Sequence, residues 1–510
     1  MKRRTLTTAT AAVTTLLLAG SAAAAGGGVG SAGIGDPYYP EYGNGGYDVR
    51  HYGIHVTYDP TADSITGRTT LRARTTERLK QFNLDLVLPA SEVLVDGRPA
   101  TFTQTEHELV VTPRRPLASG ESMEVRVTYA GRPADYRSLG IKPWITTGDG
   151  AAAVGEPEIA AWWFPSNDHP RDKARFDVKV SVPADVEALG NGSLVSSRQS
   201  GGQRTWHWRE TDPMATYLAF FVAGQFDITK SRTASGVPVI TAVASNGGSE
   251  GTYAAADLAR TPEVLAWEAR QWGPYPFDEM GGVAPAADFG FALENQTRPV
   301  YTRGFWRNGP NIYVVVHEQA HQWYGDSVSV ENWRDIWLNE GFASFTEWLW
   351  SEKHDEGTAA EIFDEVYNDI PADDTFWDLT IGDPGKGREF AGAVYDRGAM
   401  TLQALRTRIG GPAFFDVMRT WARTHRYGNG SIPQFIRLAE RISGKQLDGF
   451  FDVWLYTGAK PEPTRANGFP RDFATPTPST RTPAARRAEV PSLTKIRAVK
   501  EFLLDAGHAG

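Results

Sequence analysis

Residues 313–325 read Tyr-Val-Val-Val-His-Glu-Gln-Ala-His-Gln-Trp-Tyr-Gly, and residues 337–343 read Trp-Leu-Asn-Glu-Gly-Phe-Ala. If the first segment is helical, its period of about 3.6 residues places His317 and His321 one turn apart on the same face, where both imidazoles can bind one metal ion. After eighteen intervening residues, Glu340 can supply a third ligand from a following helix. These two segments therefore predict a metal site between two helices.

The predicted site has the ligand set of a catalytic zinc ion. Three protein ligands leave the fourth position of a tetrahedral zinc ion open for water, and Glu318 lies where its carboxylate can take a proton from that water. The chain has no cysteine, which excludes thiolate zinc sites, disulfides and a cysteine nucleophile. We therefore expect one Zn²⁺ per chain, bound by His317, His321 and Glu340.

The residues around the motif indicate a buried helix. The apolar run at residues 313–316 would bury it, and Gly325 is predicted to end it. Two acids are candidates to hold the imidazole tautomers: Glu347, two turns after Glu340 on the same face, and Asp326, at the end of the first helix. For both acids, a solvated side chain is the alternative.

A second His-Glu pair begins like the zinc motif. His107-Glu108 is followed by Val111 at the position of the second histidine. Since it falls in a predicted strand, we expect this pair to be ordinary surface.

Composition indicates a soluble, secreted protein of two or three domains. The chain has 510 residues, of which 41% are hydrophobic and 11% aromatic. Three basic residues, a short apolar run and a series of small residues predict a signal peptide over residues 1–25; its removal changes the formal net charge from −9 to −12, because three basic and no acidic residues are lost. An acidic protein is a poor candidate for nucleic-acid binding, and no other stretch is long and apolar enough to cross a bilayer. The export route, retention at the cell surface and the oligomeric state stay open.

Hydrophobic periodicity predicts an α+β fold with two domains. Alternating apolar residues, as in residues 52–58, predict a largely antiparallel β domain of the saddle or sandwich type over residues 26–228. Helical spacing predicts a mainly helical second domain over residues 229–460. A Pro-, Thr- and Arg-rich composition predicts a mostly unstructured tail at residues 461–510, with a short helix around residues 493–504.

The two segments that carry the zinc motif resemble those of the gluzincin metallo-aminopeptidases of the aminopeptidase N type. The resemblance rests on the His-Glu-x-x-His pair, the 18-residue gap and the Asn-Glu-Gly-Phe-Ala context, and it extends over about residues 35–460. It implies that the second domain is a thermolysin-like catalytic domain. Larger members add a C-terminal helical domain, so we expect a more open cleft here.

The resemblance also implies a site for the substrate's free amine. The family carries Gly-Ala-Met-Glu-Asn upstream of the zinc motif, and residues 291–295 of this chain read Phe-Ala-Leu-Glu-Asn. Glu294 and Asn295 are therefore expected to bind substrate, with Glu294 pairing with the α-ammonium group. Phe291 replaces the glycine and should alter the pocket for the first side chain.

Two further segments are similar to parts of the family's site. Residues 393–397, Ala-Val-Tyr-Asp-Arg, match the segment with the catalytic tyrosine, so the resemblance implies that Tyr395 donates a hydrogen bond to the oxyanion, with Arg397 in place of the usual lysine. The loop Gly-Glu-Pro-Glu at residues 155–158 resembles the β-domain loop that completes the amine site. Glu156 is the preferred residue in this loop, and Glu158 stays the alternative.

These features imply a secreted zinc aminopeptidase that acts on peptides with a free N-terminus, with Glu318 as the general base. One alternative is a thermolysin-like endopeptidase, which would also cut N-blocked peptides. Another is a secreted binding protein on a peptidase scaffold without catalysis. The preferred N-terminal residue is not indicated by the sequence.

Overall fold

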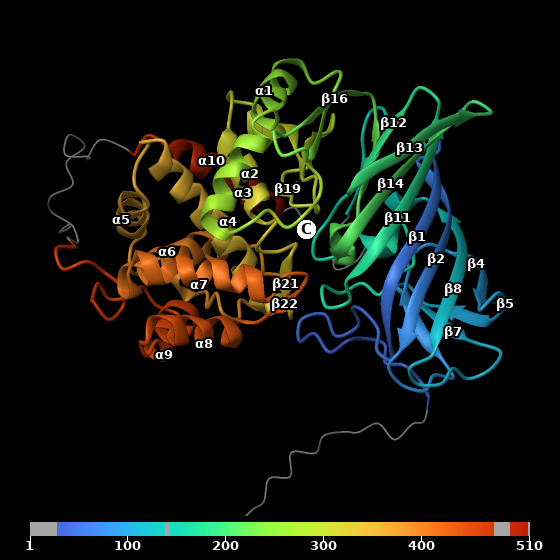
Figure 1. Cartoon of the computed structure of the whole chain (residues 1–510), viewed down its shortest axis with the longest axis horizontal. Helices are drawn as coiled ribbons and strands as arrows, with labels where there is room; N and C mark the ends of the chain where they lie inside the picture. The colour runs from blue at the N-terminus through green and yellow to red at the C-terminus, as the bar shows by residue number, and fades with distance from the viewer. Residues whose placement is uncertain (1–27, 138–142, 474–489, 508–510) are drawn as a thin grey trace, which may run out of the picture.

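A computed structural model describes residues 28–137, 143–473 and 490–507 of the chain. Figure 1 shows a β domain on one side and a mainly helical domain on the other. The predicted α+β architecture is therefore confirmed. The predicted signal peptide lies outside the described residues.

The β domain is built on one large sheet. Its strand order is β13-β14-β11-β1-β2-β8-β4-β5, and only β1 and β11 pair in parallel. The inward-facing residues of β1 alternate with outward polar ones, as their apolar period of two dictates. The strands are β1 (Tyr47–Asp59), β2 (Ser64–Thr75), β4 (Ala90–Val95), β5 (Arg98–Pro99), β8 (Ser122–Gly131), β11 (Ala174–Pro183), β13 (Ser193–Ser200) and β14 (Gln203–Met214).

Two smaller sheets complete this domain. One has the order β12-β15-β10-β9 and the other β3-β7-β6. Their strands are β3 (Phe82–Asp85), β6 (Thr101–Gln104), β7 (Glu108–Thr112), β9 (Trp144–Thr146), β10 (Ala151–Ala153), β12 (Glu187–Gly190) and β15 (Phe221–Gly224). Strands β3, β10 and β15 are wholly buried, which places them in the core of the domain.

The second domain begins with a five-stranded sheet of order β16-β17-β18-β20-β19. Its strands are β16 (Phe226–Arg232), β17 (Pro238–Ala244), β18 (Met280–Ala284), β19 (Ala292–Leu293) and β20 (Val300–Tyr301). Because β15 belongs to the first domain and β16 to the second, the change of domain falls between Gly224 and Phe226, close to the expected boundary at residue 228. Strand β19 is an edge of this sheet.

Helices make up most of the second domain. They are α1 (Gly248–Leu258), α2 (Thr261–Trp272), α3 (Ile312–Ala320), α4 (Trp337–Lys353), α5 (Ala359–Asp369), α6 (Gly392–Ile409), α7 (Gly411–Thr424), α8 (Ile432–Ser443) and α9 (Asp448–Phe451), with a short parallel pair of strands, β21 (Val328–Val330) and β22 (Gly428–Gly430). Asn311 caps α3 by accepting a hydrogen bond from the Tyr313 backbone N–H at 3.3 Å. Helix α3 ends at Ala320, earlier than Gly325 predicted, but His321 keeps helical backbone angles.

Part of the tail predicted to be unstructured is folded. The Tyr367 hydroxyl donates to the Pro461 carbonyl at 2.6 Å, and Phe469 is buried. The expected short helix is present as α10 (Leu493–Gly507), whose Ile496 and Val499 are fully buried against the second domain. Of the helices in the described ranges, none has the length and apolar character needed to cross a membrane.

Candidate active site

The predicted metal ligands meet between α3 and α4. The His317 and His321 rings lie edge to face with 4.9 Å between their centroids, and their Nε2 atoms lie 3.4 and 3.5 Å from Glu340 Oε2. One ligand atom from each residue falls within 4.8 Å of the others, and all three side chains are buried. Among the described residues, this is the one group of three or more such side chains close enough to share a metal ion.

Hydrogen bonds to the other ring nitrogens orient both imidazoles. His317 Nδ1 lies 2.7 Å from Glu347 Oε1, and His321 Nδ1 lies 3.0 Å from the Tyr324 carbonyl oxygen. Because both partners accept, each Nδ1 carries a proton, and Nε2 is the ring atom that faces Glu340 and is available to a metal ion. Glu347 therefore contacts His317 as the helical spacing predicted.

The Asp326 side chain makes no hydrogen bond to a zinc ligand, although its backbone N–H donates to the His321 carbonyl at 2.9 Å. It is fully buried, which excludes the solvated alternative, but the Tyr324 carbonyl takes the position beside His321 that Asp326 was predicted to take. The chain turns directly after Ala320, and that turn brings a backbone carbonyl to the ring.

The charges at this site suit a bound cation. Burial alone would lower the pKa of His317, but hydrogen bonds with Glu340 and Glu347 raise this pKa to about 10. Against the effect of burial, His321 and His317 lower the pKa of Glu340 to about 2. Two imidazoles and one carboxylate are also a donor set that catalytic zinc takes, so the residues fit this metal.

Glu318 lies on α3 between the two histidines in sequence and is buried with them. Burial of the Glu318 carboxyl raises its pKa to about 8, although the charges of His317 and His321 act to lower this pKa. A carboxylate with such a pKa can take up and release a proton near neutrality.

Tyr395 reaches the same site from α6. Its ring lies 6.0 Å from the His317 ring at an interplanar angle of 28°. Arg397, two residues on, is turned away from the site and donates to backbone carbonyls alone: Trp377, Leu379, Val453, Trp454 and Thr457. Arg397 therefore anchors α6 to the chain around residues 452–457.

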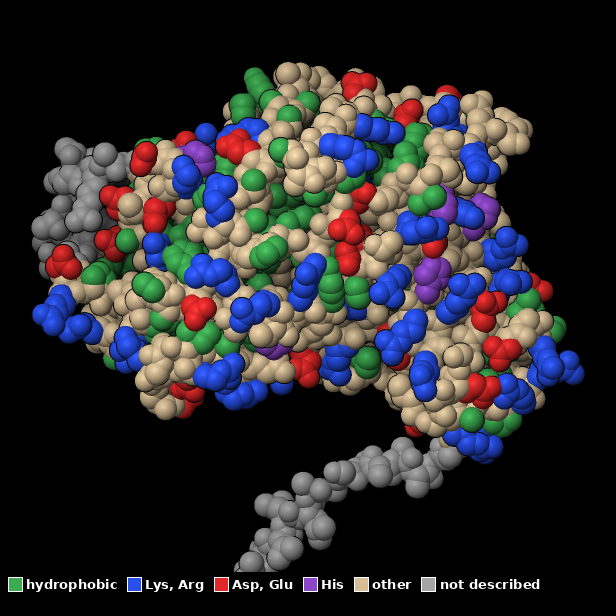
Figure 2. All heavy atoms as spheres, viewed as in Figure 1, with side chains coloured by type: hydrophobic (Ala, Val, Ile, Leu, Met, Phe, Trp, Pro, Cys, Tyr) green, Lys and Arg blue, Asp and Glu red, His purple; other side chains and the backbone are tan. Residues whose placement is uncertain are grey.

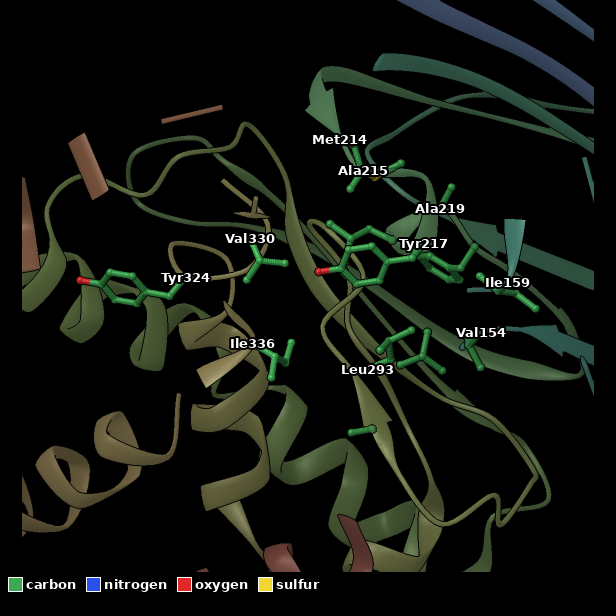
Figure 3. Packing of buried hydrophobic residues seen from close by; sticks show 14 of the residues in the cluster. Val154, Ile159, Met214, Ala215, Tyr217, Ala219, Leu293, Tyr324, Val330 and Ile336 are labelled. Atoms are coloured by element: carbon green, nitrogen blue, oxygen red, sulfur yellow. The ribbon is translucent and has the colours of Figure 1, made fainter. Parts of the chain in front are cut away.

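Glu294 follows edge strand β19 and is buried at the boundary between the domains. Tyr217 of the β domain donates its hydroxyl hydrogen to Glu294 Oε1 at 3.1 Å. Figure 3 shows the Tyr217 hydroxyl pointing toward the second domain, among apolar residues that include Leu293. Gln322, the residue after the ligand His321, donates from Nε2 to the Glu294 carbonyl at 2.9 Å, which places Glu294 next to the metal ligands.

The two glutamates of the loop at residues 155–158 have different neighbours. Burial is the largest cause that raises the pKa of Glu156 well above its ordinary value. The charges of Glu294, Glu340 and Glu318 raise this pKa further. Glu158 instead accepts a hydrogen bond from the Tyr42 hydroxyl inside the β domain. The structure thus brings Glu156, and not Glu158, to Glu294.

Asn295 and Phe291 have other partners. Asn295 Nδ2 donates to the Leu218 carbonyl at 3.0 Å, a contact between the domains. The Phe291 ring packs edge-on against Phe289 at 4.9 Å.

His107 is a further difference from the prediction. Only 17% of its side chain is exposed, and its Nε2 lies 3.5 Å from Asp85, so the expectation of ordinary surface is wrong. Tyr217 was not singled out from the sequence, because no motif surrounds it. Its position next to Glu294 follows from the packing of the two domains against each other.

The fold and site define the class of two-domain zinc peptidases, in which a β domain precedes a catalytic domain with a two-histidine, one-glutamate metal site. Sequence comparison agrees: the Peptidase M1 N-terminal domain matches residues 49–218 and the Peptidase family M1 domain matches residues 306–454. Together these matches cover more than half of the chain. The chain belongs to peptidase family M1.

Curated relatives carry aminopeptidase names. Aminopeptidase M1 of Arabidopsis thaliana is 26% identical over 337 residues, which are 62% of this chain and 36% of the relative. Aminopeptidase Ey of Gallus gallus is 27% identical over 359 residues, 64% of this chain and 36% of the relative. The chain thus spans little more than a third of the length of these relatives.

Solved structures match over a larger share of this chain and of their own length. The M1 zinc metallopeptidase from Deinococcus radiodurans superposes with a TM-score of 0.75 at 28% identity, covering 85% of this chain and 100% of that one. A mutant of that enzyme bound to a Tyr-Ser-Ala substrate superposes with a TM-score of 0.73 at 27% identity, with the same coverage. Zinc is the metal these structures are named for, and His317, His321 and Glu340 fit it.

Proposed function

We propose that the chain is a secreted zinc aminopeptidase that removes the first residue from peptides with a free N-terminus. The observation that carries this proposal is the buried Glu294 carboxylate beside the metal ligands, with Glu156 close to it. Neither carboxylate forms an ion pair with a basic side chain in the described part of the chain, and Glu156 Oε1 has no hydrogen-bond partner there. Two uncompensated carboxylates complement an α-ammonium group.

In this proposal the amine site sets which bond is cut. The ammonium group binds Glu294 and Glu156, and the backbone of the substrate lies along the free edge of β19. The first peptide bond then lies between Glu318 and Tyr395, since both flank the metal ligands. The anionic end of the cleft leaves no further subsite beyond the first residue.

Proton transfer falls to the chain's own side chains. Glu318 takes the proton of the attacking water and returns it to the leaving nitrogen. Tyr395 donates its hydroxyl hydrogen to the developing oxyanion, and burial, followed by the charge of Glu340, raises its pKa and keeps it protonated for this role. A zinc ion held by His317, His321 and Glu340 would supply a Lewis acid that polarises the carbonyl and acidifies water.

A panel of aminoacyl fluorogenic substrates and their N-acetylated counterparts, with and without a chelator, tests this function. We expect chelator-sensitive cleavage of the free-amine substrates alone. Cleavage of N-blocked peptides would favour an endopeptidase. No turnover by zinc-loaded protein would favour the binding-protein alternative.

Secretion rests on residues 1–25, where a basic start, an apolar run and small residues support a signal peptide. Expression of the full chain followed by mass measurement of the protein in the medium tests it. An extracellular product lacking these residues supports export, and an intact intracellular product contradicts it.

A further inference from the structure

The solvent-facing side of the large β sheet is basic, although the whole chain has a formal net charge of −9. Figure 2 shows Lys, Arg and His side chains gathered over the β domain. They come from five neighbouring strands, β14, β11, β1, β2 and β8. The basic side chains on this face are His51, His55, Arg68, Arg72, Arg74, Arg126, Arg175, Lys179, His207 and Arg209.

Strand register places four of these groups in one row. His207 pairs with Lys179, Lys179 with His55, and His55 with Arg68, across β14, β11, β1 and β2. Adjacent strands lie about 4.8 Å apart, so this row, which we call the basic row, extends over about 14 Å. Lys179 and Arg68 flank His55 on its two neighbouring strands, so their positive charges lie in this row on either side of it.

Nearby acids compensate the flanks of the basic row and leave its centre uncompensated. Asp177 lies 2.6 Å from His207, 2.9 Å from Arg209 and 3.1 Å from His51. Glu124 lies 3.3 Å from Arg72 and 3.6 Å from Arg126. In the described part of the chain, no carboxylate lies within ion-pair distance of Arg68 or Lys179, and both side chains are exposed.

The pKa of His55 depends on the positive charges at the centre of the basic row. His55 lies between Arg68 and Lys179, and its Nε2 is 3.4 Å from Ser181 Oγ. Burial, and then the charges of Arg68 and Lys179, lower its pKa. The charges of Arg68 and Lys179 therefore add to the effect of burial in disfavouring a proton on His55.

The shape and composition of the face select the kind of anion. It is the surface of a sheet, and no Phe, Tyr or Trp points outward from its five central strands, so it offers no platform on which nucleic-acid bases could stack. It also presents no helix or ribbon to enter a major groove. A polymer recognised through regularly spaced charges alone fits these features.

We propose that the basic row, with Arg175 beside it, binds a linear anionic polysaccharide. The guanidinium groups can hold sulfate or phosphate groups in bidentate fashion, and Lys179 acts as a point charge. Binding would release counterions from the polymer and would weaken as salt rises. The surface lies in the β domain and is separate from the metal site, so it would hold the protein at an anionic matrix without occupying its cleft.

Heparin, as the probe, tests this proposal with the full chain. We expect measurable binding at low salt, a dissociation constant about tenfold higher for the double variant Arg68→Gln/Lys179→Gln, and a salt-dependence slope lower by about 2. The matched control is Arg437→Gln/Arg441→Gln, which removes the same charge from exposed positions of α8. In NMR titrations, the pKa of His55 should rise when heparin is added.

Three outcomes would overturn the proposal. The first is no heparin binding by the unaltered chain at low salt. The second is an equal loss of affinity in the control variant, which would indicate net charge and not the basic row. The third is tighter binding to phosphatidylglycerol vesicles than to heparin, lost in the Arg68→Gln/Lys179→Gln variant, which would make a membrane surface the partner.

Discussion

Gly341 and Gly398 bring two helices of the candidate active site into backbone contact. A Cβ atom on Gly341 would lie 2.9 Å from the Gly398 Cα atom, and a Cβ atom on Gly398 would lie 2.7 Å from the Gly341 Cα atom. Gly341 follows the ligand Glu340 on α4, and Gly398 lies three residues after Tyr395 on α6. Since every other residue type carries a Cβ atom, only glycine allows this approach.

Gly398→Ala should therefore push α6 away from α4 and move Tyr395. Overpacking of this kind costs about 1–3 kcal/mol of stability, and we expect kcat to fall more than KM rises because Tyr395 acts after binding. Thermal unfolding and steady-state kinetics measure the two effects. Gly411→Ala is the control, because a Cβ atom there meets nothing within 4 Å; wild-type kcat in Gly398→Ala would contradict the packing argument.

Glu318→Gln should abolish hydrolysis while zinc stays bound. The amide keeps the size of the side chain but cannot take a proton, and loss of a general base typically costs about 10²–10⁴-fold in kcat. Elemental analysis should still give one zinc per chain, whereas His317→Ala should lose both metal and activity. A Glu318→Gln variant with near-normal kcat would rule out the proposed base.

Glu347→Gln should weaken zinc binding without removing a ligand. The 2.7 Å contact with His317 Nδ1 orients the ring and makes it more basic, and loss of such a partner typically costs about 10–100-fold in metal affinity. Competition with a chromophoric chelator measures the dissociation constant. Asp326→Asn is the comparison: burial raises the pKa of Asp326 well above its ordinary value, and no contact with a zinc ligand is lost, so its zinc affinity should stay near wild type.

The metal site could be predicted because it depends on local geometry. A helical period fixes His317 relative to His321 and Glu340 relative to Glu347, whatever the rest of the chain does. The position of Asp326 could not be predicted, because it depends on the turn after Ala320, where the chain leaves the helix.

Features that depend on contacts between distant segments do not follow from local geometry, and for the amine site the resemblance to the aminopeptidase family supplied the preference for Glu156. The choice between Glu156 and Glu158 requires the path of a loop across the domain boundary, and Tyr217 reaches Glu294 only through that same boundary. The basic face of the large sheet could not be predicted from the composition for a different reason. Net charge sums over the whole chain, whereas strand register decides that Arg68 and Lys179 flank His55.

Glu294→Gln should impair binding of the substrate's amine selectively. Replacing the carboxylate removes a charge-assisted contact, and breaking such a pair in a buried site costs about 2–5 kcal/mol, which we expect mainly in kcat/KM for free-amine substrates. Tyr217→Phe removes only the hydrogen bond to Glu294 and should cost about 0.5–1.5 kcal/mol. The readout is the ratio of kcat/KM for a free-amine substrate to that for its N-acetylated counterpart: a ratio that falls toward one in Glu294→Gln would support the role of Glu294, and an unchanged kcat/KM for the free-amine substrate would contradict it.

Helix α10 should behave as part of the core of the second domain. Ile496 is fully buried, and Asn311, which caps the zinc-ligand helix α3, donates from Nδ2 to the Lys495 carbonyl at 3.3 Å. Ile496→Ala should therefore lower the free energy of unfolding by about 2–5 kcal/mol, because it leaves a cavity between α10 and its neighbours. Arg497→Ala is the matched control on the next residue, since its ion pair with Asp369 is largely exposed and worth at most about 1 kcal/mol. Chemical denaturation measures both variants, and an Ile496→Ala protein as stable as Arg497→Ala would mean that the C-terminal segment does not dock as the structure describes.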